Sequence, residues 1–256
     1  MKLSDVKKLH QKKYRAQFGF YLVEGEHLVL ELLNVLKQAS AEVPNASDIT
    51  LYATEGYREW VTSHFGAVNK LCKLEVVTEQ QMQQLSDTPS PQGIIARVPL
   101  AFAGNPLARE AKKSTRYVYL YEVQDPGNLG TILRTLAWFG NFTLLLSPNS
   151  VDPFNSKVVR ASMGAIFHVN MELNVPLETL NTRFSKFAYL DMQGTRIGDS
   201  KFADYECYLF GNEARGVPSN TISTLNADAF TINGSGKIDS LNLASAVNIC
   251  AYELSR

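Results

Sequence analysis

Polar residues or glycines follow an apolar, strand-like stretch at three places in the chain, which are residues 124–135, residues 155–165, and the pair 209–216 and 232–246. The first place is residues 124–135, where Pro126-Gly127 makes a turn and Asn128 lies at the predicted start of a helix. An amide at this point can orient a ligand oxygen, and Arg134 follows two apolar residues of the same helix, which is an unusual place for a charge. Taken alone, the same residues also fit a helix cap and a surface cation.

Residues 209–216 and 232–246 repeat this arrangement, each as a strand, a glycine-bearing polar loop and a helix. Glycines allow a tight or left-handed backbone, so backbone groups in such loops can contact an adenine edge or a ribose. Ligands bind beyond the carboxyl ends of parallel strands, where we expect these loops to lie. No G-x-G-x-x-G fingerprint or Walker loop is present, which disfavours an ordinary dinucleotide-binding fold.

The elements that must position these loops alternate between strand and helix, which predicts an α/β fold with a parallel sheet covered on both faces. The run Leu144-Leu145-Leu146 favours a strand that is buried on both sides. The predicted strands of this part are Tyr117–Val123, Phe142–Leu146, Phe187–Leu190, Cys207–Phe210 and Ala229–Ile232. The predicted helices are Leu129–Phe139, Asn155–Gly164 and Leu243–Leu254.

The front part predicts a small α/β domain over residues 1–100, followed by a linker over 101–115 and a second domain over 116–256. Ser4 is the expected cap of a basic helix that runs to about Arg15, and Thr78 is the expected cap of helix Glu79–Leu85. A further helix is predicted at Glu26–Lys37 from its apolar spacing. The expected strands are Phe20–Val23, Ile49–Ala53, Leu74–Val77 and Gly93–Val98.

The formal net charge is zero, so only the distribution of charge bears on nucleic acid. Basic side chains that could bind RNA phosphates, or could equally form a solvated helix face, are Lys7, Lys8, Lys12, Lys13 and Arg15. Lys157 and Arg160, three residues apart, share a face of a later helix and could hold phosphate or pack a neighbour.

The cysteines and histidines have no metal-ligand or redox spacing, so we expect no metal and a reducing compartment. Cys207 and Cys250 lie in apolar runs and are expected in the core. The chain has no apolar signal region and no 18-residue apolar stretch, so it is expected to be soluble and cytoplasmic, without a membrane segment.

Taken together, the three loops resemble the SpoU (TrmH) branch of the SPOUT RNA 2′-O-ribose methyltransferases, in order across about 140 residues. The matching motifs are Asp125-Pro126-x-Asn128-x-Gly130-x-x-x-Arg134-Thr135, Gly211-Asn212-Glu213-x-x-Gly216, and Ser240-Leu241-Asn242 with Ala244 and Ala246. In front, Phe20–Gly25 and Leu85–Thr88 with Pro91-Gln92-Gly93 resemble the substrate-binding domain of such enzymes, which is similar in fold to the ribosomal L7Ae/L30e proteins.

The resemblance implies a homodimer with a C-terminal trefoil knot that binds S-adenosylmethionine, with the active site near the interface. Arg134 would be the catalytic residue. The residues implied to position it, the cofactor or the ribose are Asn128, Glu213, Ser240 and Asn242. Those implied to line the cofactor site, mainly through their backbone, are Gly211, Ile232 and Leu241, beside Leu209 and Phe210.

The implied reaction is in-line attack of a ribose 2′-oxygen on the sulfonium methyl group. Because a guanidinium stays protonated, we expect Arg134 to stabilise the developing alkoxide or to hold the adjacent phosphate. One departure from the family is that Ile232-Asn233-Gly234 stands where Ile-Pro-Met is usual, which bears on cofactor affinity.

The implied substrate is RNA, with ribosomal RNA preferred over transfer RNA because of the front domain. One alternative is a non-catalytic RNA-binding protein of the same fold. Another alternative is a small-molecule enzyme on an ordinary parallel sheet, which the neutral net charge would suit. Binding of S-adenosylmethionine separates the first alternative from the enzyme, and a steep salt dependence of RNA affinity separates the second.

Overall fold

The computed structural model describes residues 1–38, 46–66, 72–102, 116–238 and 240–256. The chain divides into two compact units, a front unit of residues 1–109 with 152–168, and a second unit of residues 110–151 with 169–256. The predicted linker over 101–115 lies almost entirely outside the described residues. The predicted domain boundaries remain a prediction, and the division places residues 152–168 with the front unit.

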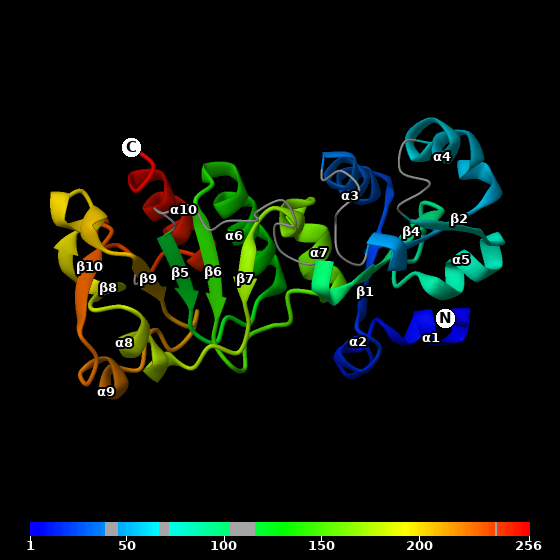
Figure 1. The fold of residues 1–256 in the computed structure, drawn as a ribbon. Coiled ribbons are helices and arrows are strands. Elements are labelled where there is room, and N and C mark those ends of the chain that lie inside the picture. Colours follow the sequence, from blue (N-terminus) through cyan, green and yellow to red (C-terminus); the bar gives the residue numbers. More distant parts are fainter. Residues whose placement is uncertain (39–45, 67–71, 103–115, 239) are drawn as a thin grey trace. The chain divides into compact units, whose positions relative to one another are not determined.

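The second unit is built on a six-stranded sheet with the order β10-β8-β9-β5-β6-β7 (Figure 1). Every neighbouring pair in it is parallel, which confirms the predicted α/β fold with a parallel sheet. The strands are β5 Arg116–Leu120, β6 Phe142–Leu146, β7 Asn170–Glu172, β8 Phe187–Arg196, β9 Cys207–Phe210 and β10 Ala227–Thr231.

Helices cover both faces of this sheet. On one face α6 (Pro126–Phe139) packs side by side with α10 (Leu243–Glu253), as Figure 1 shows. On the other face Tyr119 and Leu145 pack with α8 (Leu180–Arg183) and with Ile222 of α9 (Ser219–Ile222). Every residue of β6 is buried, as its apolar run predicts.

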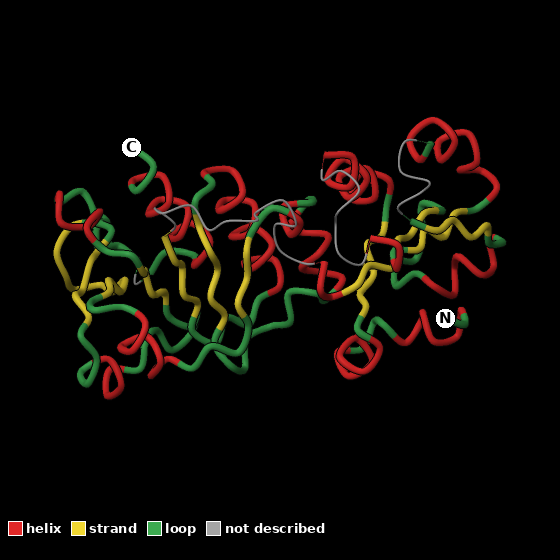
Figure 2. The backbone as a smooth tube through the Cα atoms, in the orientation of Figure 1, coloured by secondary structure: helices red, strands yellow, loops and turns green. Residues whose placement is uncertain are grey.

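The front unit has a four-stranded sheet with the order β1-β4-β2-β3, in which only β2 and β3 run parallel. Its strands are β1 Phe20–Glu24, β2 Thr50–Ala53, β3 Lys73–Val76 and β4 Ile94–Pro99. Its α-helices are α1 Leu3–Lys8, α2 Lys12–Phe18, α3 Glu26–Gln38, α4 Arg58–Phe65, α5 Glu79–Leu85 and α7 Ser156–Ser162 (Figure 2). Short 3-10 helices in the two units are Ala46–Asp48, Glu55–Tyr57, Leu100–Phe102, Ala165–Phe167, Leu177–Thr179 and Ser200–Asp204.

Two local predictions of the front unit have different outcomes. Thr78 caps α5 in a capping box with Gln81, as expected. The predicted single helix from Ser4 to Arg15 is wrong, because α1 and α2 are separate helices that begin after Lys2 and Gln11. The break between α1 and α2 leaves the backbone carbonyls of Leu9 and His10 without helical partners, and Arg15 of α2 donates hydrogen bonds to both. Within the described residues, no helix is long and apolar enough to cross a membrane.

Candidate functional site

Three side chains, one from each predicted loop, meet at the carboxyl-end edge of the six-stranded sheet. The Asn128 amide donates to Glu213 Oε1 at 3.3 Å, and the Asn242 amide donates to Asn128 Oδ1 at 2.8 Å. We call these three residues the motif cluster. Loops that are 85 and 114 residues apart in the chain are therefore joined by direct hydrogen bonds, as expected for the ends of parallel strands.

Two helix N-termini hold the amides of the motif cluster in place. The Asp125 carboxylate accepts the Asn128 backbone N–H at 2.6 Å and caps α6, whose first residue is Pro126. Asn242 caps α10 by accepting the N–H of Ser245 at 3.2 Å. Each cap satisfies backbone donors that a helix start leaves open, so the two asparagines are positioned by α6 and α10, which pack together.

Glu213 fastens the loop after β9 to the loop after β5. Besides Asn128, its carboxylate accepts the backbone N–H groups of Gln124 and Asp125, each at 3.3 Å. The neighbouring Asn212 amide donates to the Glu122 carbonyl at 2.7 Å. The Glu213 carboxylate therefore serves several donors at once and is fixed in orientation.

Gly211 allows the loop after β9 to fold back on itself. A β-carbon added at Gly211 would lie 2.3 Å from the carbonyl carbon of Gly216, which is far inside van der Waals contact. The backbone of Asn212 pairs with that of Gly216 across the same turn. Glycine is therefore required at position 211 for the approach of two backbone segments.

A cavity of about 580 Å³ opens at this edge of the sheet, entirely within the second unit. The expected site residues that line it are Asn128, Phe210, Gly211, Glu213, Ile232, Ser240, Leu241 and Asn242. Its wall also includes Ala214, Gly216, Val217, Thr231, Leu243 and Ala246. A cavity of this size, with apolar and polar groups side by side in its wall and several of the polar groups fixed, suits a small organic ligand.

Two expected site residues do not line the cavity. Leu209 is fully buried in the core on the α8 face of the sheet. Arg134 is exposed on α6, and it has no hydrogen-bond or ion-pair partner among the residues that the structure describes. The Arg134 guanidinium is thus available to a ligand or to another chain.

The family model of the SpoU rRNA methylase family matches residues 115–252, more than half of the chain. The chain belongs to the SpoU rRNA methylase family. The model of the MRM3-like substrate-binding domain matches residues 1–96, in front of the SpoU domain. Both parts of the resemblance found in the sequence are therefore confirmed at the level of the family.

Relatives of this SpoU protein cover nearly its whole length. It is 27% identical to the 23S rRNA (guanosine(2553)-2′-O)-methyltransferase RlmP of Bacillus subtilis, over 99% of this chain and 95% of that one. The AdoMet-bound rRNA methyltransferase from Sinorhizobium meliloti is 27% identical, with a TM-score of 0.76, over 98% of this chain and 93% of that one. The SpoU methyltransferase AviRb from Streptomyces viridochromogenes shares the fold, with a TM-score of 0.78 at 20% identity, over 99% of this chain and 96% of that one.

The SpoU cavity has a further wall that the sequence analysis missed, formed by Leu190, Asp191 and Met192. Strand β8 continues to Arg196 instead of ending at Leu190, with an irregular register against β10 that brings these residues to the cavity. Their signal in the sequence was the same one that marks the three motifs, because the polar Asp191 directly follows an apolar strand.

The departure at Asn233 has a structural counterpart in the SpoU domain. With its amide oxygen facing Arg196, Asn233 accepts hydrogen bonds from Nε at 2.8 Å and from Nη2 at 3.2 Å of that guanidinium. Thr231, two residues earlier, pairs with Arg196 in the ladder between β10 and β8. An amide–guanidinium contact therefore holds the end of β10 where a proline is usual in the family.

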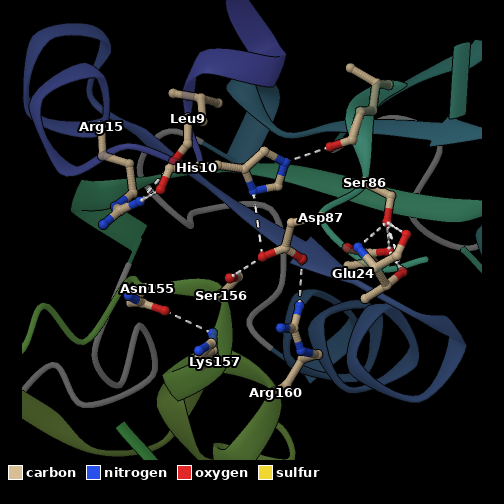
Figure 3. Close-up of polar contacts among 12 residues, drawn as sticks. Leu9, His10, Arg15, Glu24, Ser86, Asp87, Asn155, Ser156, Lys157 and Arg160 are labelled. Atoms are coloured by element: carbon tan, nitrogen blue, oxygen red, sulfur yellow. Dashed lines mark hydrogen bonds and ion pairs between the residues drawn. The ribbon is translucent and has the colours of Figure 1, made fainter. Parts of the chain in front are cut away.

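The predicted RNA-binding side chains of the front unit fall into two groups. Those exposed on α1, α2 and α7 are Lys7, Lys8, Lys12, Lys13 and Lys157. Arg15 is only 3% exposed, and its guanidinium binds Asp152 at 2.5 Å. It also donates to the carbonyls of Leu9 and His10, at 2.8 and 2.9 Å (Figure 3). These contacts give Arg15 a packing role, because they occupy its charge and close the break between α1 and α2.

Arg160 also has an internal partner in the front unit. Asp87 accepts from Arg160 Nη1 at 2.7 Å and from the Ser156 hydroxyl at 2.5 Å, and His10 Nδ1 lies 3.9 Å from the same carboxylate (Figure 3). We call Asp87, Ser156 and Arg160 the Asp87 cluster. Burial alone would raise the pKa of the Asp87 carboxyl, but the hydrogen bonds from Ser156 and Arg160 and the nearby positive charge outweigh it, so this pKa lies below its ordinary value.

The thiols of the SpoU domain lie in the core, as expected. Cys207 and Cys250 are both buried, and burial, helped by the charge of Glu253, raises the pKa of Cys250 to about 12. Such thiols stay protonated and are poor nucleophiles. Among the described residues, no three acidic, histidine or cysteine side chains gather in a way that could hold a metal ion.

Proposed function

We propose that this chain transfers the methyl group of S-adenosylmethionine to a ribose 2′-hydroxyl in ribosomal RNA. The observation that carries the proposal is the motif cluster, since it brings together the three SpoU motifs on one cavity. Membership of the SpoU rRNA methylase family supports the same reaction. Two of the relatives named above, RlmP and the Sinorhizobium meliloti protein, are rRNA methyltransferases by name, which supports ribosomal over transfer RNA.

The residues of the cavity fit the methyl donor. The tight turn at Gly211 brings the backbone of Gly211 and Gly216 to the cavity wall, and Phe210, Ile232 and Leu241 supply apolar contacts. A nucleoside bound largely through backbone groups and apolar walls suits this lining. We therefore assign Phe210, Gly211, Ile232 and Leu241 to the cofactor. S-adenosylmethionine, when bound, supplies a methyl group on a positively charged sulfur that is already activated for transfer.

The chain's own task is then to position the ribose and to stabilise negative charge on its oxygen. Arg134 suits the second task, since a guanidinium stays protonated and can donate two parallel hydrogen bonds to phosphate or to a developing alkoxide. It cannot serve as the base, so the proton of the hydroxyl goes to another acceptor. The hydrogen-bonded Asn128, Glu213 and Asn242 are held rigid, which preorganises the site for the ribose.

We also propose that the protein works as a homodimer through the outer surface of α6 and α10. Trp138 is 85% exposed and Tyr252 58% exposed on these helices, and Ile249 is exposed nearby. Large apolar side chains exposed together mark an interaction surface. Arg134 lies one turn before Trp138 on the same face of α6, so the dimer surface would place the catalytic charge near the interface.

We also propose that the second unit contains a trefoil knot. Strand β10 lies at one edge of the sheet, yet the chain returns from it to α10, which packs on α6. On this return, residues 240–243 and Ala246 line the same cavity as β8 and the loop after β9. This path supports a C-terminal segment that passes through an earlier loop, a rare feature of proteins.

The front unit is proposed to bind the RNA through its exposed lysines on α1, α2 and α7. Phosphate contacts by Lys7, Lys8, Lys12, Lys13 and Lys157 would make the affinity fall steeply with salt. The match to an MRM3-like substrate-binding domain supports this role. The reaction on ribosomal RNA would place the protein in the cytoplasm.

The deciding experiment maps 2′-O-methyl groups in RNA from cells with and without the gene, together with calorimetric titration of S-adenosylmethionine into the pure protein. We expect one ribosomal position to lose its methyl group in the deletion strain, and we expect the pure protein to bind the donor. Absence of donor binding would favour a non-catalytic RNA-binding protein. Loss of a methyl group from transfer RNA alone would correct the substrate.

A further inference from the structure

The wall of the cofactor cavity is acidic. Among the described residues that line it, Asp191 and Glu213 are carboxylates, and no lysine, arginine or histidine is present. A cavity with two carboxylates and no cation favours a positively charged ligand over a neutral one. The question is which of the two carboxylates is available to a ligand.

Glu213 is already engaged by the protein. Its two oxygens accept from the Asn128 amide and from the backbone N–H groups of Gln124 and Asp125. These three donors compensate much of its charge and fix it as part of the motif cluster. Glu213 therefore has little capacity left for a cofactor.

Asp191 is different, because its carboxylate still has most of its capacity to accept hydrogen bonds. One oxygen accepts the backbone N–H of Gln193 at 2.9 Å, and the other has no hydrogen-bond partner among the residues that the structure describes. The residue follows Leu190 on β8, where it lines the cavity, and none of the three motifs contains it.

We propose that Asp191 is a specificity residue that makes the cavity favour the charged methyl donor over the neutral product. This inference depends on the proposed function. S-adenosylmethionine carries a sulfonium and an ammonium against one carboxylate, a net charge of +1, whereas S-adenosylhomocysteine has lost the sulfonium charge and is neutral. A carboxylate in the cavity attracts the former and is nearly indifferent to the latter, so it limits product inhibition and helps the product leave.

Calorimetric titration of both ligands into the full chain tests this. Asp191→Asn keeps the size of the side chain and an oxygen for the Gln193 N–H, but removes the charge. The matched control is Asp199→Asn, since Asp199 is exposed, also accepts the backbone N–H of the residue two positions later, Lys201, at 3.0 Å, and does not line the cavity. The wild-type preference for the donor should also shrink when salt is raised from about 0.05 M to about 0.5 M, because salt screens exposed charges.

We expect Asp191→Asn to weaken binding of S-adenosylmethionine about fivefold and binding of S-adenosylhomocysteine by less than about twofold, the size of one partly screened charge contact. Asp199→Asn should change neither affinity. Equal weakening of both ligands, or no change in either, overturns the role of Asp191 while leaving the proposed function intact. A wild-type chain that binds neither ligand overturns the proposed function and this inference with it.

Discussion

The motif cluster of the second unit and the ion pairs of the front unit contain similar residue types but use them differently. In the front unit, Arg15 is buried against Asp152, and Arg160 is paired with Asp87. In the second unit, Arg134 is exposed without a partner among the described residues, and the amides of Asn128 and Asn242 stand at the wall of a cavity.

The difference shows how to separate structural from ligand-binding polar groups. A buried charge is tolerated only when its partners are inside the protein, so its hydrogen bonds are already used. A site needs groups that are held in place yet keep spare capacity, such as amides fixed by helix caps beside an open cavity. Four substitutions test this comparison.

The largest effect on stability is expected from Arg15→Ala. This change leaves the Asp152 carboxylate, whose side chain is only 12% exposed, without its counter-ion, and it leaves the carbonyls of Leu9 and His10 without their hydrogen-bond donor. We expect the free energy of unfolding, measured with urea, to fall by about 3–5 kcal/mol. The exposed Lys12→Ala on the same helix should change it by less than about 0.5 kcal/mol. A similarly small loss of unfolding free energy for Arg15→Ala would show that the Arg15–Asp152 pair contributes no more than an exposed ion pair.

Arg134→Ala should behave in the opposite way. Turnover with saturating cofactor and RNA should fall about 100- to 1000-fold, as when a group that stabilises an oxyanion is removed. The free energy of unfolding should change by less than about 0.5 kcal/mol, because the side chain is exposed. Arg134→Lys retains the positive charge but lacks the planar fork, so its turnover should lie between that of the wild type and that of Arg134→Ala. Near wild-type turnover of Arg134→Ala would remove Arg134 from the mechanism.

Gly211→Ala should disturb the site through its backbone. The added β-carbon would meet the backbone of Gly216 and Val217, which cannot move aside as a flexible side chain could. We expect a loss of about 1–3 kcal/mol in stability, measured by urea unfolding, and weaker titration of S-adenosylmethionine. Gly198→Ala is the control, since an added β-carbon there has no heavy atom within 4 Å. Unchanged cofactor binding in Gly211→Ala would mean that the turn is not needed.

The smallest effect is expected from Asp87→Asn, and only as a function of pH. Since the folded-state pKa of Asp87 is lowered, its charged form contributes stability above the unfolded pKa, and this contribution is lost as pH falls below about 4. The contribution should stay below about 1 kcal/mol, because the side chain is partly exposed. We expect the free energy of unfolding in urea to fall less between neutral and acid pH for Asp87→Asn than for the exposed Asp199→Asn. Equal pH profiles would show that the Asp87 cluster contributes no acid sensitivity.

Much of the fold was predictable because periodicity and turn residues act locally. Strands β6 and β9 have the predicted bounds, and α5 begins at the predicted cap. The short β7 was not predicted, since three residues carry no pattern of their own. The separate α1 and α2 were also missed, because the bonds that stabilise the break come from a distant residue, Asp152, and from Arg15.

The site was predictable to the extent that its residues share one sequence pattern. The meeting of Asn128, Glu213 and Asn242 followed from the ends of parallel strands. The pairing of Arg15 and Arg160 did not follow, because charge in a sequence does not show whether a partner lies nearby in the fold. The cavity role of Asp191 depended on where β8 ends, and strand ends are the least predictable part of a strand.

The cap that Asn242 provides to α10 has a consequence for biosynthesis. The side-chain amide of Asn242 that caps α10 also donates a hydrogen bond to Asn128. The cavity wall is therefore incomplete until residue 242 has left the ribosome. If the front unit folds once its last residue, His168, has left the ribosome, a nascent chain that still lacks residue 242 already exposes its lysines, yet it has no finished place for a methyl donor. Capacity to hold RNA would thus arise earlier in translation than capacity to modify it.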